Sequence, residues 1–160
     1  MENDNTVPDI FPHTRSTDIF SYMHGHTWKS VFDFKACFNV ITTTPGAQRA
    51  LAIITPHGTY LPLVMPFGPT NAPAVSERFT NMVTEDLENT YKFVDDTITI
   101  SPSDEVHIID LYSFFTRVRS HHLRFGFKKA QIAMREIAYL GKIASLEGIR
   151  PSEKGLTKLR

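Results

Sequence analysis

The chain has 160 residues, a hydrophobic fraction of 41% and twelve phenylalanines, which is typical of one folded domain with a core. Seventeen basic and seventeen acidic residues leave no net charge, so no global field indicates a nucleic-acid partner. A lone cysteine, Cys37, excludes a disulfide framework and a cysteine-rich zinc site, while the lack of a long apolar run or a signal peptide predicts an intracellular protein without a membrane partner.

The first half of the chain predicts a helix, a strand and a hairpin. Residues 15–24 carry apolar side chains at helical spacing, and residues 28–35 alternate, as expected of a strand with Asp33 on the face opposite its apolar side chains. Pro56-His57-Gly58 is typical of a turn and predicts a hairpin between residues 49–55 and 59–65.

Helical periodicity dominates the second half. Asn71 is expected to cap a helix of about four turns, and the segment Ser101-Pro-Ser-Asp104 predicts a capping box with proline at the first helical position. Strands are expected at residues 131–133 and 136–145. The expected apolar stripes are Val75, Phe79, Met82, Val83 and Leu87 on the first helix, then Ile108, Leu111, Phe115 and Val118 on the second. This order predicts an α+β fold with helices packed on one face of an antiparallel sheet.

Two adjacent carboxylates, Asp95 and Asp96, lie between the β-prone segments 92–94 and 97–100. The pattern predicts a hairpin whose turn presents acid, and a divalent cation would neutralise the two like charges. Such a pair in a solvated turn is also ordinary loop chemistry. The metal-site interpretation gains weight from Asp33 and the segment Met65-Pro-Phe-Gly68.

Several short motifs then resemble one family in order and spacing. The chain resembles the palm region of reverse transcriptases of gypsy-type LTR retrotransposons from about Phe11 to about Lys158. One departure is Phe93, which stands where that family has tyrosine before its paired aspartates. The matching segments are Val31-Phe-Asp-Phe-Lys-Ala-Cys-Phe-Asn-Val-Ile41, Gly58 to Pro73 with Met65-Pro-Phe-Gly68, Phe93-Val-Asp-Asp96, Ser101 with His107, Lys128-Lys129, Tyr139-Leu-Gly141 and Gly148-Ile149.

The resemblance implies a two-metal polymerase site. Asp33 and Asp95 would bridge two Mg²⁺ ions, for which Mn²⁺ can substitute, with Asp96 as the neighbouring carboxylate and the carbonyl of Phe34 as a further ligand. Lys129 would protonate the pyrophosphate leaving group. Read from the residues alone, Asp33 is equally a solvent-facing strand residue, and Lys129 an ordinary solvated lysine.

The resemblance also implies contacts with the nucleotide and the primer. Phe38 would exclude a ribose 2′-hydroxyl, and Phe67 and Gly68 would contact the incoming nucleotide and template, the glycine allowing close backbone approach. The alternatives are a buried core phenylalanine and a structural turn. The hairpin that holds the primer end would contain Tyr139, Leu140 and Gly141, which alternatively form a core strand that ends in a glycine turn.

The function implied is RNA-directed DNA polymerisation by a retroelement module. Residues 1–160 would be one palm-type domain, a truncated fingers and palm fragment without thumb, connection or RNase H. Its partners would be a primed RNA or DNA template, deoxynucleoside triphosphates and other parts of a polyprotein. Two alternatives remain: an inactive relic or co-opted palm-fold module for binding or structure, and an unrelated α+β domain with a chance acidic hairpin.

Overall fold

The computed structural model describes residues 6–9, 11, 15–94 and 96–152. Within them no helix is long and apolar enough to cross a membrane. The helices are α1 (Ser16–Met23), α2 (Pro45–Ala50), α3 (Ala72–Thr84) and α4 (Asp104–Ser120), with short 3₁₀ turns η2 (Cys37–Val40) and η3 (Phe127–Lys129). The strands are β1 (Trp28–Lys35), β2 (Ile53–Thr55), β3 (Gly58–Tyr60), β4 (Thr90–Phe93), β5 (Asp96–Ser101), β6 (Arg124–Phe125), β7 (Gln131–Met134), β8 (Ile137–Tyr139), β9 (Lys142–Ser145) and β10 (Gly148–Pro151).

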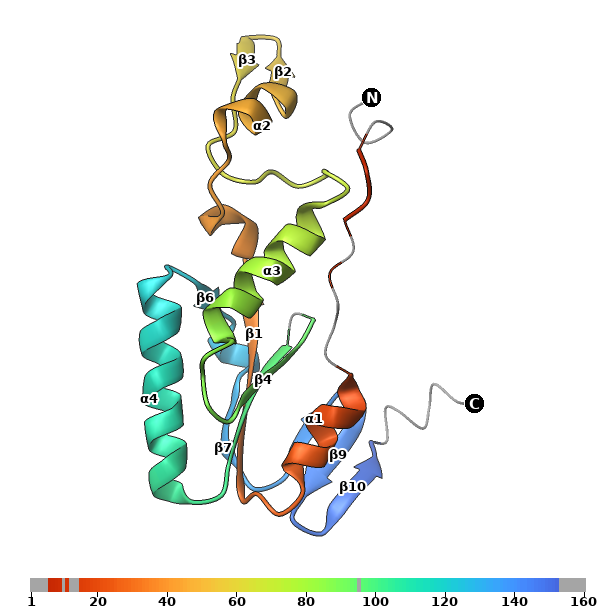
Figure 1. The fold of residues 1–160 in the computed structure, drawn as a ribbon, viewed down its shortest axis with the longest axis vertical. Helices are drawn as coiled ribbons and strands as arrows, with labels where there is room; N and C mark the ends of the chain where they lie inside the picture. The colour runs from red at the N-terminus through yellow and green to blue at the C-terminus, as the bar shows by residue number, and fades with distance from the viewer. Residues whose placement is uncertain (1–5, 10, 12–14, 95, 153–160) are drawn as a thin grey trace.

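The main sheet is antiparallel and is built around β1. Its strand order is β4-β5-β1-β6, and β7 also pairs with β1. β1 and β5 both alternate in sequence, so each presents one side-chain row to each face of the sheet. Two smaller sheets, β8-β9-β10 and β2-β3, lie toward opposite ends of the molecule's long axis (Figure 1).

Each face of the main sheet has its own core. On one face Phe32 packs with Phe114 and Val118 of α4 and with Val83 of α3. On the other face Val31 and two isoleucines of β5 pack against α1 and the β8-β9 hairpin. This agrees with the predicted α+β class and antiparallel sheet; α3 and α4 share one face, and α1 lies on the other (Figure 1).

The prediction for residues 28–35 is confirmed at both ends of β1, and α1 lies within the expected residues 15–24. The first hairpin was predicted too long. Arg49 belongs to α2 rather than to a strand, because Thr44 caps that helix by accepting from the Ala47 N–H and Pro45 occupies its first turn. Past Tyr60 the pairing of β3 ends, although Val64 forms an isolated bridge with Thr42.

Asn71 precedes α3 as predicted, but its side chain does not cap the helix. Its Oδ1 accepts from the Asp9 N–H at 3.0 Å and its Nδ2 donates to the Val7 carbonyl at 2.9 Å. The amide therefore ties the N-terminal segment to α3. Of the expected apolar stripe, Val83 is fully buried, whereas Met82 is 51% exposed.

The second helix was predicted with the wrong cap, and its predicted apolar face is confirmed in part, since Val118 is buried and Leu111 and Phe115 pack against the core. Ser103, not Ser101, caps α4 by accepting from the Val106 N–H, so Pro102 lies before the helix. Ile108 was expected in the core but is 69% exposed, while His107 and Asp110 are buried. Apolar spacing could not indicate the burial of His107 and Asp110, because both side chains are polar.

Candidate functional site

Asp33 and Asp96 are direct cross-strand partners in the antiparallel pair of β1 and β5. Directly opposed residues point to the same face of a sheet, with Cβ atoms about 4.5–5.5 Å apart. The fold therefore brings together two of the three predicted carboxylates. Asp95, the third, lies outside the described residues.

The expected acidic hairpin is formed by β4 and β5, but Asp96, which was predicted in the turn, is the first residue of β5. Phe93 pairs with Asp96, so a two-residue connection joins the strands. Val94, the first residue of that connection, has a φ of 54°. The left-handed region is sterically unfavourable for a β-branched residue, and such strain concentrates at functional sites. β-branched residues from Thr97 to Ile100 keep the second strand extended.

Lys129 lies beside Asp33. Its Nζ is 3.9 Å from Asp33 Oδ2, and the lysine and aspartate side chains are 76% and 34% exposed. The backbone brings η3 to this place, because the Gly126 N–H donates to the Asp33 carbonyl at 2.9 Å. The solvent-accessible lysine can therefore reach an anionic group of a substrate that binds next to these carboxylates.

The donor set of this site suits a hard divalent cation. Opposed carboxylates repel each other, and Mg²⁺ is held by one or two carboxylates together with substrate oxygens and water. No group of three or more His, Cys, Asp or Glu side chains in the described part of the chain is arranged as a complete metal cage. Asp33 and Asp96 fit an ion that shares its ligands with a substrate.

Two of the predicted nucleotide-binding side chains meet. The rings of Phe38 in η2 and Phe67 in the loop after β3 contact edge to face at 5.2 Å between centroids. Phe67 is 78% exposed, which makes its ring available to a ligand. Gly68 has a φ of 114°, a conformation that favours glycine. Phe34 instead packs partly buried against the core around α4.

The predicted primer hairpin is the turn between β8 and β9. Tyr139 ends β8, and Leu140 and Gly141 form the turn with φ values of 47° and 76°. The Tyr139 hydroxyl is buried without a hydrogen-bond partner among the described residues. Burial, and then the charge of Asp96, raise the pKa of Tyr139. The negative charge of Asp96 therefore adds to burial in disfavouring the ionised form of Tyr139.

A buried polar network lies on the opposite face of β1, and sequence reasoning missed its role. His107 Nδ1 and Nε2 lie 2.8 Å from Ser101 Oγ and Ser30 Oγ respectively. The Ser101 hydroxyl donates to Asp110 Oδ2 at 2.6 Å, and Ser30 Oγ accepts from the Ala133 N–H. Helix α4 is thereby tied to β1, β5 and β7.

These directions assign a proton to one nitrogen of the histidine ring. Because the Ser101 hydroxyl donates to Asp110, its oxygen must accept from His107 Nδ1–H. In the neutral ring, Nε2 then accepts from the Ser30 hydroxyl. Burial lowers the pKa of His107, although the charge of Asp110 opposes this effect. The sequence motif had marked Ser101 and His107, but nothing in their spacing indicated a buried network.

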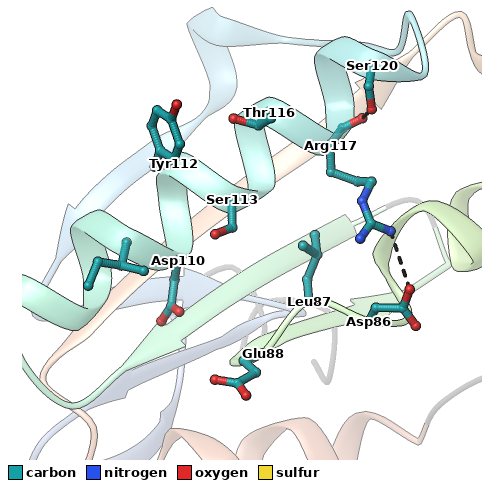
Figure 2. Close-up of a pocket in the computed structure, with 10 residues that line it drawn as sticks. Asp86, Leu87, Glu88, Asp110, Tyr112, Ser113, Thr116, Arg117 and Ser120 are labelled. Carbon is teal, nitrogen blue, oxygen red and sulfur yellow. Dashed lines mark hydrogen bonds and ion pairs between the residues drawn. The ribbon is translucent and has the colours of Figure 1, made fainter.

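A cavity of about 530 Å³ lies away from the paired carboxylates, between α4 and the segment 86–88. Figure 2 shows Arg117 reaching across it toward Asp86, at 3.7 Å, while Tyr112 points outward. Asp110 lines the cavity but also accepts hydrogen bonds from Ser101 and Asn89. The cavity therefore adjoins the histidine network rather than the carboxylate site.

A family model described as reverse transcriptase (RNA-dependent DNA polymerase) matches residues 3–143. The retrovirus-related Pol polyprotein from transposon 297 of Drosophila melanogaster is 28% identical over 152 residues, which cover 94% of this chain and 14% of the relative. The Tf2-3 transposon polyprotein of Schizosaccharomyces pombe is 23% identical over 98% of this chain and 12% of its own length. The chain thus spans a small part of these relatives.

Two solved structures share the fold. The foamy viral protease-reverse transcriptase dRH in complex with double-stranded DNA superimposes with a TM-score of 0.84 at 18% identity, covering 98% of this chain and 28% of that one. The foamy viral protease-reverse transcriptase in complex with an RNA/DNA hybrid gives a TM-score of 0.79 at 20% identity, covering 97% and 21%.

Proposed function

The chain belongs to the reverse transcriptase (RNA-dependent DNA polymerase) family, and from that membership we propose that it is a polymerase module of an LTR retroelement polyprotein. Residues 1–160 form a single palm-type domain with part of the fingers in this proposal. The reaction is the addition of deoxynucleotides to a primer 3′ end. The observation that carries the proposal is the cross-strand pairing of Asp33 on β1 with Asp96 on β5. Asp96 belongs to the β4-β5 hairpin, where the family has its paired aspartates.

Asp33, Asp95 and Asp96 hold Mg²⁺ in this proposal, with the Phe34 carbonyl as an additional ligand. The bound metal would supply activation of the primer 3′-oxygen and stabilisation of charge on the triphosphate. Lys129, which lies 3.9 Å from Asp33, would place a proton near the pyrophosphate leaving group. Opposed carboxylates with an exposed lysine at one side support this division of roles.

Nucleotide selection would depend on the aromatic pair. Phe38, whose ring contacts the ring of Phe67, would occupy the space that a ribose 2′-hydroxyl needs. Gly68 would let template or nucleotide approach the backbone closely. Tyr139, Leu140 and Gly141 would position the primer end near Asp96. The two structural neighbours are complexes with double-stranded DNA and with an RNA/DNA hybrid, which supports a primed template as the partner of this chain.

Metal binding gives the first test. Titration calorimetry with Mg²⁺ and Mn²⁺ compares the chain with the double variant Asp95→Asn, Asp96→Asn and with Glu147→Gln, which removes an exposed carboxylate from the β9-β10 turn. We expect binding in the chain and the control and its loss in the double variant. Equal binding in all three would contradict the proposed site and favour the relic or co-opted module.

Primer extension then tests the reaction itself. The assay uses a primed RNA template, deoxynucleoside triphosphates and either metal. Extension that disappears in the double variant supports the polymerase. Metal binding without extension would locate the defect in substrate binding rather than in the carboxylates, because phosphate contacts supply much of the affinity for nucleic acid.

A further inference from the structure

The neutral net charge of the chain conceals a strongly basic segment. Residues 111–135 contain no aspartate or glutamate, yet include Arg117, Arg119, Arg124, Lys128, Lys129 and Arg135. The segment runs from the second half of α4 through β6 and η3 into β7. The fold then adds one more cation from a distant part of the sequence.

That cation is Lys35 at the end of β1, which is the direct cross-strand partner of Arg124 in β6. Both side chains are exposed, and no ion pair joins either of them to a carboxylate among the described residues. Like charges directly opposite each other on a sheet are destabilising. A bound anion would remove this repulsion.

The surroundings of the pair favour a nucleotide strand as that anion. The Lys35 stem lies across the Gly126 backbone, since a Cβ at residue 126 would come within 2.8 Å of Lys35 Cε. The next residue, Phe127, is 73% exposed, and Lys128 beside it is exposed as well. Cations beside an exposed aromatic ring are the combination that binds phosphates and stacks an unpaired base.

We propose that Lys35, Arg124, Phe127 and Lys128 form a docking surface for single-stranded nucleic acid. The cations contact successive phosphates and the Phe127 ring stacks on a base. A duplex would not offer the face of an internal base to this ring, and cations spread over β1, β6 and η3 suit a run of phosphates better than one triphosphate. The biological role of this surface rests on the proposed polymerase function, but its binding does not require catalysis.

Fluorescence anisotropy of a labelled twelve-nucleotide oligothymidylate, in EDTA and over a salt series, tests the surface. The variants are Lys35→Gln with Arg124→Gln, and Phe127→Ala. The control is Arg15→Gln with Arg135→Gln, which removes the same charge elsewhere; Arg135 lies over Trp28 at the other end of β1. We expect the variant Lys35→Gln with Arg124→Gln to bind the oligothymidylate at least about tenfold more weakly at low salt. The slope of log K against log salt concentration should be shallower by about 1.4 for this variant. Phe127→Ala should lose about fivefold or more with an unchanged slope.

A charge reversal separates binding from folding. Arg124→Glu places an opposite charge across from Lys35. The Tm of this variant should therefore not fall, while its binding of the oligothymidylate is lost. Affinities equal to the control in both the Lys35→Gln, Arg124→Gln variant and Phe127→Ala would overturn the proposal. Binding that needs Mg²⁺ would also overturn it, because the affinity would then belong to the carboxylate site. Displacement of the oligothymidylate by dTTP at an equal concentration of nucleotide would overturn it as well, because the site would then bind a free nucleotide. Because EDTA removes the metal, failure of the proposed polymerase site leaves this test intact.

Discussion

Asp33 and Asp96 face each other across β1 and β5, at the end of the longest ladder in the main sheet. The ladder holds two like charges together through backbone pairing rather than through any attraction between the side chains. Lys129 at 3.9 Å from Asp33 offsets part of the repulsion. The pairing therefore has a cost in the metal-free protein, and this cost can be measured.

Removing one of these charges should stabilise the metal-free chain. We expect Asp96→Asn to raise the free energy of unfolding in EDTA by about 0.2–1 kcal/mol, because it ends the repulsion by Asp33. Saturating Mg²⁺ should reverse the order, since the unmodified chain, with one more carboxylate at the site, gains more binding energy than the variant. Urea denaturation with and without metal measures both effects, and Glu147→Gln should show neither. A destabilised Asp96→Asn variant in EDTA would refute the repulsion.

The histidine network should be important for stability. His107→Ala would leave the hydroxyls of Ser30 and Ser101 without their buried partner, and we expect a loss of about 2–4 kcal/mol in the free energy of unfolding. His57→Ala, at an exposed turn position, should change it by less than about 0.5 kcal/mol. Chemical denaturation compares the two variants. Similar small losses would mean that the network contributes little.

The same network predicts a pH dependence. Burial lowers the pKa of His107 in the folded state below the value of about 6.5 expected in the unfolded chain. Near and below pH 6.5 the unfolded chain therefore binds more protons, so stability is complete above that pH and decreases as the pH falls. The slope from this one residue cannot exceed about 1.4 kcal/mol per pH unit.

Chemical denaturation between pH 5 and 8 measures the free energy of unfolding of the chain and of His107→Gln. The part of the pH slope that is due to the His107 ring should be absent from the variant. Nitrogen-15 NMR of the folded chain at pH 6 gives a second readout that does not depend on the variant. We expect a neutral ring protonated on Nδ1. A charged His107 at pH 6 would contradict the assigned hydrogen-bond directions.

Truncation of two phenylalanines should reduce the stability of the chain by very different amounts. Phe32 is fully buried and stacks on Phe114 at 4.7 Å, so Phe32→Ala should cost about 3–5 kcal/mol of stability. Phe67 is 78% exposed, and among the described residues its ring contact is with Phe38, so Phe67→Ala should cost less than about 1 kcal/mol. Thermal unfolding distinguishes these outcomes. A large loss for Phe67→Ala would indicate a structural rather than a ligand-binding ring.

Local patterns determined much of what could be predicted. The alternation of residues 28–35 determined β1 and the face of Asp33, because a strand shows its pairing face every second residue. The turn chemistry around Asp95 and Asp96 determined the acidic hairpin, and the order of short motifs indicated the family. The roles of all the predicted site residues, from the metal-binding aspartates to the primer turn, stay predictions.

The tertiary structure decided what joins residues that are distant in sequence. The register of Asp33 against Asp96, and of Lys35 against Arg124, depends on strand pairing that no local pattern specifies. The burial of His107 on α4 was missed because its ring nitrogens find their partners in serines on β1 and β5. A neutral composition likewise said nothing of charge placement, since electrostatics depend on distance in space, and only folding determines that distance.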